Sequence, residues 1–239
     1  MNRVTFTESD CNIETSSVWL AAALQFADKI GFLQAFHGFK LKMKERNYTV
    51  IQKLLTIVTS ILSGCEYTSD INYRLAEETL SANLLGMDRF PDQSQINILL
   101  NRMDESNIQQ LRDIHHELFV QNSHSIYSDK SIVVDFDQSG LVANGKTYEL
   151  AEKGYFPKKK GQSGYQLSAA FVGRYSETIE LFLDPGNVHC TNRFDDLLAA
   201  THSKFKEFLN NRSLIIRTDS GYVLLTISRN WKPLKVFSM

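Results

Sequence analysis

The sequence predicts an α/β protein (α+β overall), in which a helical N-terminal half precedes a C-terminal half built around a sheet. Apolar residues recur at spacings of three and four through the first 120 residues. After residue 130 this pattern gives way to short β-branched and aromatic runs. The length of 239 residues suits one large domain or two small ones. We therefore expect a helical region over residues 1–125 and a second domain over 126–239, divided in the polar stretch 121–130.

Five helices are expected in the first half. Each shows a stripe of apolar residues on one helical face, which indicates a packing surface. The first opens on serines that can cap a helix, and the fourth opens on the sequence Pro-Asp-Gln-Ser. The expected helices cover residues 16–36, 49–63, 72–85, 91–103 and 107–120.

Strands dominate the prediction for the second half. The expected strands cover residues 131–137, 165–173, 178–183 and 213–218, and glycines suggest a turn into a further short strand near 140–147. A strong stop signal at Asp184-Pro185-Gly186-Asn187 precedes an amphipathic helix over 192–209. The order of strands, helix and strand indicates an α/β arrangement. The apolar run after Pro233 can at best form one more strand.

Composition excludes several classes of protein. The net charge is −1, split as −4 over residues 1–130 and +3 over residues 131–239, so the chain as a whole carries no basic signal. Apolar runs are too short for a membrane span, and the acidic N-terminus does not resemble a signal peptide. Three well-separated cysteines suit a reducing compartment. We expect a cytoplasmic protein without a membrane partner.

Carboxylates at strand ends are the first candidates for chemistry. Asp135 and Asp137 are two residues apart, so in a strand both side chains point to one face. Asp219 directly follows the apolar run Leu214–Ile216. Carboxylates at such positions are costly unless they are paired, hydrogen-bonded or bound to a metal. They can ligate Mg²⁺ or cap turns, and the spacing alone leaves both interpretations open.

A basic segment lies between these carboxylates. Residues 153–176 contain five basic residues and no acidic one. Lys158, Lys159 and Lys160 are consecutive and are flanked by aromatic residues. Such a segment suits contact with a phosphate backbone, although a run of three lysines is also typical of a solvated loop.

Several linked motifs together resemble the DDE transposases of bacterial insertion sequences. They are Val134-Asp135-Phe136-Asp137-Gln138-Ser139, Asn144-Gly145-Lys146, Glu152-Lys153-Gly154-Tyr155, Lys158–Gly161, Asp184–His189 and Arg217-Thr218-Asp219-Ser220-Gly221-Tyr222. The helical half adds Leu62–Tyr67 and Phe90–Gln95. The resemblance implies a ribonuclease-H-like catalytic domain, here an incomplete mixed sheet with flanking helices, behind a helical DNA-binding region.

The resemblance also assigns roles to residues. Asp137 matches the first catalytic aspartate, with Asp135 as the alternative, and Asp219 matches the second. Both would bind Mg²⁺ or Mn²⁺, and Lys153 together with Lys158, Lys159 and Lys160 would contact DNA. The implied reaction is metal-dependent cleavage at transposon ends followed by strand transfer. The implied partners are double-stranded DNA, as transposon ends and target, and a second copy in a homodimer when the protein is intact.

One departure from the family pattern affects the expected activity. The family uses a third carboxylate, a glutamate on a later helix, and Asp219 is the last acidic residue of this sequence. We therefore expect a C-terminally truncated, inactive copy. Two other interpretations stay open at this point: a non-catalytic DNA-binding or partner-binding remnant, and a ribonuclease-H-like nuclease.

Overall fold

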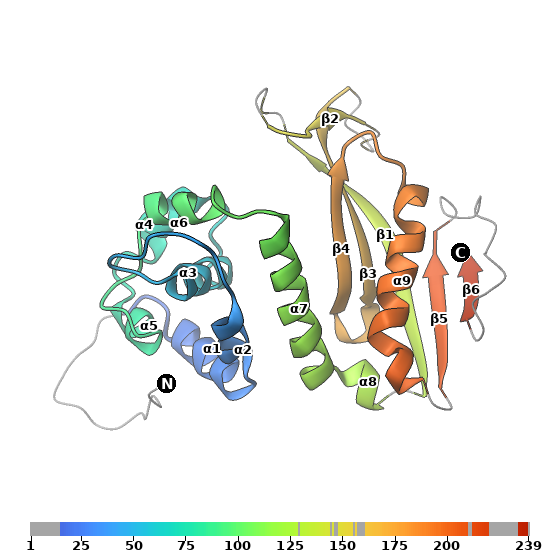
Figure 1. Ribbon diagram of the computed structural model, residues 1–239, viewed down its shortest axis with the longest axis horizontal. Coiled ribbons are helices and arrows are strands. Elements are labelled where there is room, and N and C mark those ends of the chain that lie inside the picture. The colour runs from blue at the N-terminus through green and yellow to red at the C-terminus, as the bar shows by residue number, and fades with distance from the viewer. Residues whose placement is uncertain are drawn as a thin grey trace. The chain divides into compact units, whose positions relative to one another are not determined.

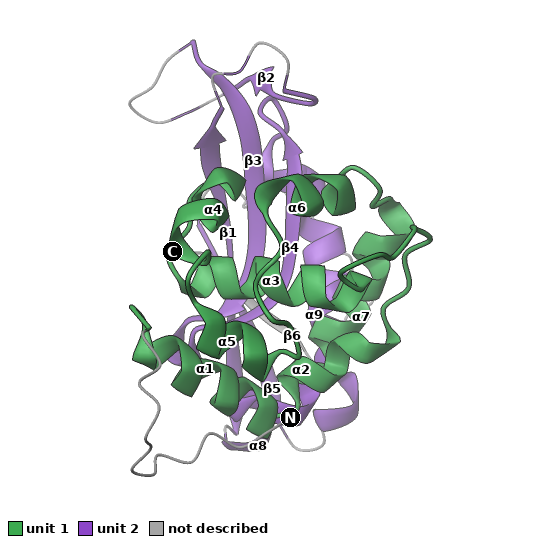
Figure 2. Cartoon of the chain, turned by 90° about the vertical axis from the view of Figure 1, so that its left-hand side faces the viewer, with its two compact units in different colours: residues 1–118 green, residues 119–239 purple. Residues whose placement is uncertain are grey.

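The protein forms two compact units, Met1–Leu118 and Phe119–Met239 (Figure 2). The computed structural model describes residues 15–128, 130–143, 145, 148–154, 156, 161–209 and 212–219, and the backbone of 234–238. Each unit has hydrophobic clusters of its own.

Unit 1 is helical, as the sequence predicts. Its longer helices are α1 (Val18–Lys29), α3 (Val50–Leu62), α6 (Gln93–Leu100) and α7 (Glu105–Asn122), which continues into the second unit. Its shorter ones are α2 (Phe32–Ala35), α4 (Ile71–Arg74) and α5 (Thr79–Leu84), with 3₁₀ turns η1 (Phe36–Gly38) and η2 (Thr68–Asp70). At the start of α3, Thr49 and Gln52 exchange side-chain-to-backbone hydrogen bonds, a capping box that sets this boundary.

Two of the five expected helices are wrong as single elements. The helix expected over 16–36 breaks into α1 and α2 at Gly31, whose φ of 78° is left-handed and ends the helical hydrogen bonding. The helix expected over 72–85 breaks into α4 and α5 at the turn before Glu78. That side chain is buried and accepts hydrogen bonds from Thr15 and Ser16. The apolar spacing continues across both breaks, so periodicity alone does not reveal them.

Unit 2 holds one mixed sheet (Figure 1). Its elements in chain order are α8 (His124–Ser128), β1 (Ser131–Val142), β2 (Glu152–Lys153), β3 (Ser163–Val172), η3 (Gly173–Tyr175), β4 (Glu177–Pro185), η4 (Cys190–Arg193), α9 (Phe194–Phe205), η5 (Lys206–Phe208), β5 (Ser213–Thr218) and β6 (Leu234–Ser238). No described helix is long and apolar enough to cross a bilayer.

The strand order places β1 at the centre of the sheet. β4 pairs with β3 and β3 with β1, both antiparallel, whereas β5 pairs with β1 and β6 with β5, both parallel. The connection from β4 to β5 passes through α9. Three antiparallel strands followed by two strands parallel to the first, with a helix at the crossover, is the ribonuclease-H-like arrangement expected from the sequence.

One strand prediction needs correction. The turn expected near Gly140 is wrong, because β1 runs on to Val142 and Gly140 pairs regularly with Gln166 of β3. The polar stretch 121–130, where the boundary was expected, contains the end of α7 and all of α8. The strand β2 was not predicted, because its two residues are too few to show a pattern. The further strand expected at 145–147 lies largely outside the described residues.

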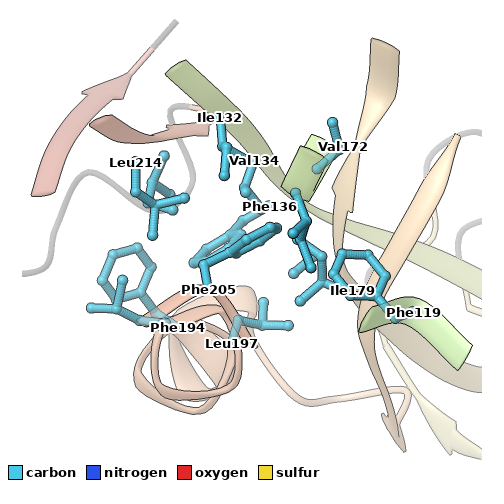
Figure 3. Packing of buried hydrophobic residues seen from close by; sticks show 14 of the residues in the cluster. Phe119, Ile132, Val134, Phe136, Val172, Ile179, Phe194, Leu197, Phe205 and Leu214 are labelled. Carbon is cyan, nitrogen blue, oxygen red and sulfur yellow. The ribbon is translucent and has the colours of Figure 1, made fainter. Parts of the chain in front are cut away.

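The core of unit 2 lies between the sheet and α9 (Figure 3). Ile132, Val134 and Phe136 alternate along β1 and are all buried on the side that faces α9. α9 meets them with Phe194, Leu197 and Phe205. Because strand side chains alternate between faces, this packing sends the intervening residues of β1 to the other face of the sheet.

Candidate active site

Asp135 and Asp137 lie on the face of β1 that points away from α9. Asp135 lies between the buried residues Val134 and Phe136, which point toward α9, and Asp137 follows Phe136. Opposite them on β3 are Phe171 and Ala169, respectively. The two aspartates share a face, as their spacing requires, but their surroundings differ.

Asp135 is engaged in an ion pair with the neighbouring strand. Its register partner on β5 is Arg217. The guanidinium donates from Nε to Oδ1 at 2.6 Å and from Nη2 to Oδ2 at 2.8 Å. These hydrogen bonds raise the pKa of Arg217. Because both carboxylate oxygens accept hydrogen bonds from Arg217, the side chain of Asp135 links β1 to β5.

Asp137 is the freer of the two carboxylates. Its side chain is exposed, and Oδ1 accepts a local hydrogen bond from the backbone N–H of Gln138 at 2.8 Å. Asp137 is therefore better placed than Asp135 to accept an external cation or donor.

Asp219 is the first residue after β5 and is also exposed. The parallel register of β1 and β5 ends with Asp135 opposite Arg217 and Phe136 opposite Thr218. Asp137 and Asp219 are each the next residue beyond the last pair, Asp137 still within β1 and Asp219 directly after β5.

A cavity of about 700 Å³ opens beside Asp219. Asp219 and residues from β1, β3 and the loop after β4 line it: Gln138, Ser139, Gly140, Gln166, Gly186, Asn187, Val188, His189 and Cys190. Asp137 is not part of this lining, which on β1 begins at Gln138. Burial, and then the charge of Asp219, raise the pKa of the Cys190 thiol. That thiol is a neutral part of the wall at physiological pH.

An ion pair holds the loop that supplies half of this wall. The carboxylate of Asp184, buried at the end of β4, accepts from Arg193 Nε at 2.9 Å and from Arg193 Nη2 at 2.7 Å. Arg193 also contacts Asp196 at 2.6 Å and lies over the ring of Phe182. The loop between Asp184 and Arg193 is therefore closed at its base, which positions Asn187 and His189 at the cavity.

Glycines bring the β2 segment against the same wall. A Cβ on Gly154 would lie 1.6 Å from the carbonyl oxygen of Gly186, so only glycine permits this approach. The ring of Phe156 is buried and covers Gly140, where an added Cβ would lie 2.6 Å from the ring. The segment that leads into the basic run is thus anchored beside the cavity at Phe156.

The predicted DNA-contacting lysines are only partly described. Lys153 is exposed on β2, next to the glycine contact. Lys158, Lys159 and Lys160 lie outside the described residues. Their proposed contact with phosphate therefore stays a prediction.

The donors at the strand ends suit a hard divalent cation in part. Asp137 and Asp219 supply carboxylate oxygens, and Mg²⁺ in proteins takes one or two carboxylates together with water and substrate phosphate. Within the described part of the chain, no group of three or more His, Cys, Asp or Glu side chains is close enough to hold a metal ion. The two aspartates can therefore anchor a cation but do not enclose it.

Sequence reasoning missed much of the cavity. Gln138, Gln166 and Asn187 gave no chemical signal in isolation, and the pairing of Asp184 with Arg193 spans nine residues of loop. The available signal is the segment Asp184–His189, which the sequence marks both as a stop after β4 and as one of the family motifs.

A ribonuclease-H-like sheet, with Asp137 on its central strand β1 and Asp219 directly after the neighbouring parallel strand β5, defines the fold class of this chain. The comparison with protein families identifies its family. The profile described as "Transposase DDE domain group 1" matches residues 15–232. The chain belongs to this family of DDE transposases. No curated protein matches the sequence.

Solved structures with similarity to this chain are also transposases. The piggyBac transposase synaptic complex with hairpin DNA shares 14% identity over 92% of this chain and 50% of that one, with a TM-score of 0.41. The Mos1 transposase paired-end complex with left transposon end shares 12% over 89% and 66%, with a TM-score of 0.25. The Mos1 mariner paired end complex with Mn shares 11% over 91% and 76%, with a TM-score of 0.27. This chain spans half the length of the piggyBac chain, and no residue role follows from similarity at this level.

Proposed function

We propose that this DNA transposase uses Asp137 and Asp219 as its first two catalytic carboxylates, within an insertion-sequence element. The observation that supports this assignment is the parallel register of β1 and β5, which ends one residue before Asp137 and one residue before Asp219. Asp135 is the alternative for the first carboxylate, and we favour Asp137 because Arg217 donates hydrogen bonds to both carboxylate oxygens of Asp135.

The two aspartates would hold Mg²⁺ or Mn²⁺ at the strand ends. A divalent ion bound there would polarise the scissile phosphodiester and neutralise charge that develops on it. In the proposed reaction, water attacks phosphorus at the transposon end and the 3′ oxygen leaves as a hydroxyl. That 3′ hydroxyl then attacks a phosphodiester of target DNA. The chain's own residues bind the cation and orient the phosphate.

Basic residues of the β2 segment would bind the DNA backbone. Lys153 is exposed, and Phe156 anchors the segment against the wall of the cavity. Lys158, Lys159 and Lys160 follow this anchor in the sequence. We expect the partner to be duplex DNA, with the transposase acting as a homodimer in the nucleoid-containing cytoplasm.

Strand transfer in the family relies on a third carboxylate in addition to the two assigned here. Two carboxylates are sufficient to bind Mg²⁺ through water-rich coordination, but they give less control over its position. Metal binding is therefore a better first test than turnover.

The test measures Mn²⁺ binding to the full chain by calorimetry and by electron paramagnetic resonance. Asp137→Asn and Asp219→Asn should each weaken binding by about tenfold or more, in line with the loss of a direct ligand. Asp135→Asn is the matched control and should bind Mn²⁺ like the wild type. Equal loss in all three variants, or in none, would contradict the assignment.

Nuclease assays with Mg²⁺ then separate the alternatives. Cleavage that prefers transposon ends would support the transposase. Cleavage without that preference would favour a ribonuclease-H-like nuclease. Duplex DNA binding without metal binding would favour a non-catalytic DNA-binding protein.

A further inference from the structure

A row of cations crosses the surface of unit 1, far in sequence from the catalytic carboxylates. Residues 39–46 read Phe-Lys-Leu-Lys-Met-Lys-Glu-Arg, in which basic and apolar side chains alternate before Glu45. Residues 1–118 contain 11 Lys or Arg and 15 Asp or Glu, a net charge of −4. Four of those 11 cations fall within the seven residues 40–46, so the row stands out against an acidic unit.

The structure turns this alternation into a one-sided surface. Leu41 and Met43 are partly buried and pack against the cluster around Leu33, Phe36 and Leu54. Lys40, Lys42 and Lys44 are exposed, as is Arg46. We call these four residues the basic row. Alternate side chains of an extended segment lie on one side and about 6.6 Å apart.

The backbone under the basic row is held in place from α7. The N–H of Lys40 donates to Oε1 of Gln110 at 2.7 Å. Its carbonyl accepts from Asn107 Nδ2 and from Gln110 Nε2, both at 3.0 Å. Two amide side chains therefore satisfy the backbone of Lys40, which leaves its ammonium group outside.

The one carboxylate within the row is turned away from it. Glu45 Oε1 accepts a hydrogen bond at 2.8 Å from the backbone N–H of Val50, at the start of α3. A carboxylate at a helix N-terminus interacts favourably with the helix dipole. The carboxylate of Glu45 therefore stabilises the start of α3.

The basic row ends at a groove of about 450 Å³. Arg46 and Arg89 lie on this groove, together with amide side chains of Asn47, Asn72 and Gln95. Asp92 also lines it, but its carboxylate caps α6 by accepting from the Gln95 N–H and the Ser94 hydroxyl, hydrogen bonds that lower its pKa. Cations and amide donors thus continue from the row into the groove.

We propose that the basic row is a second DNA-binding surface, which contacts successive phosphates of one strand of duplex DNA. Four exposed cations within seven residues, on a segment anchored at Lys40 by Asn107 and Gln110, match a polyanion with regularly spaced charges. Phosphate contacts of this kind fix the register of a protein on DNA without reading its sequence. The inference rests on the proposed function only in that the chain handles duplex DNA.

The experiment measures binding of the full chain to a duplex of random sequence over a range of salt concentrations. Each phosphate contact contributes about 0.9 to the slope of log K against log salt. A triple variant should therefore lower the magnitude of the slope by roughly 2.7. It carries Lys40→Gln, Lys42→Gln and Lys44→Gln. The matched control, Lys29→Gln/Arg102→Gln/Lys130→Gln, removes the same charge from exposed sites elsewhere and should change the slope little.

A second variant tests whether the lost charge, and not a change in local folding, causes the change in slope. Lys40→Arg/Lys42→Arg/Lys44→Arg keeps the cations and should keep the slope, with circular dichroism confirming the helical content of each variant. A glutamine variant that matches the wild type or the control, or an arginine variant that loses the slope, would overturn the inference. A wild-type chain without salt-dependent DNA binding would instead overturn the proposed function itself.

Discussion

At the scale of single residues, two aspartates that look equivalent in the sequence have different structural roles. Asp135 lies opposite Arg217 in the parallel register and is paired through both oxygens. Asp137, two residues on, has passed the last paired residue of β5 and is exposed. The distinction depends on where β5 ends relative to β1. A residue pattern within β1 cannot reveal that boundary.

Gly154 gives a test of the close approach that anchors the β2 segment. Gly154→Ala would place a Cβ 1.6 Å from the Gly186 carbonyl oxygen, so the two backbones must separate. We expect destabilisation of about 1–3 kcal/mol, the usual cost of overpacking, together with faster amide exchange in β2 and the start of β3. Thermal unfolding and hydrogen exchange measure both.

Gly38→Ala is the matched control for that substitution. No atom lies within 4 Å of a Cβ added at Gly38, so its effect should stay within about 0.5 kcal/mol. If the two alanine variants were equally stable, the close contact between Gly154 and Gly186 would not be a constraint on the fold.

At the scale of elements, the loop between β4 and α9 depends on a single ion pair at its base. Asp184→Ala would leave Arg193 without its bidentate partner. Removal of one partner from a buried pair costs about 3–5 kcal/mol. Because 33% of the Arg193 side chain is exposed, we expect a smaller loss, roughly 2 kcal/mol. Chemical denaturation checks this value.

Asp196 supplies the comparison for Asp184. It also pairs with Arg193, but 48% of its side chain is exposed. Asp196→Ala should therefore cost less than about 0.5 kcal/mol. A larger loss for Asp196→Ala than for Asp184→Ala would show that the buried pair does not hold the loop.

The sequence predicts most of the elements but not all of their ends. Helix α3 lies within one residue of its predicted limits, because Thr49 and Gln52 form a capping box that a sequence pattern can display. Strand β5 matches its prediction because a short apolar run ends there in a charged residue. The break at Gly31 escaped prediction because apolar spacing continues through it. Strand β2 escaped because backbone pairing, not side-chain pattern, defines it.

The same limits apply to the candidate site. The sequence points to Asp137 and Asp219, and the structure sets them on neighbouring strands, but their roles stay predictions. The cavity beside Asp219 could not be foreseen, since its lining comes from three segments that meet only in the folded sheet. Gln138 and Gln166 line the cavity because the fold brings their strands together.

At the scale of the whole molecule, one buried lysine makes global stability depend on pH. Lys204 of α9 is 6% exposed and lies over the ring of Phe119. Burial lowers its pKa to about 8, against a smaller opposing effect from Glu180. The folded state therefore releases this proton at a lower pH than the unfolded state. Its contribution to stability is least favourable below pH 8 and improves as the pH rises toward 10.5.

Lys204→Met removes the buried charge and keeps most of the volume. We expect the variant to be more stable than the wild type at neutral pH, by up to roughly 3 kcal/mol. The difference should shrink as the pH rises above about 8, where the wild-type lysine becomes neutral. Denaturation at a series of pH values measures this, and a difference that does not change with pH would contradict it.

The central position of β1 sets the proposed catalytic residue Asp137 apart from the segments at the rim of the sheet. β1 pairs with β5 as far as Phe136, and beyond that point the main chain of β3 fixes the level of Asp137 through its pairing with Ala169. The β2 segment and the loop after β4 attach at the rim of the sheet. Changes in the length or charge of these rim segments would therefore leave the pairing around Asp137 in place.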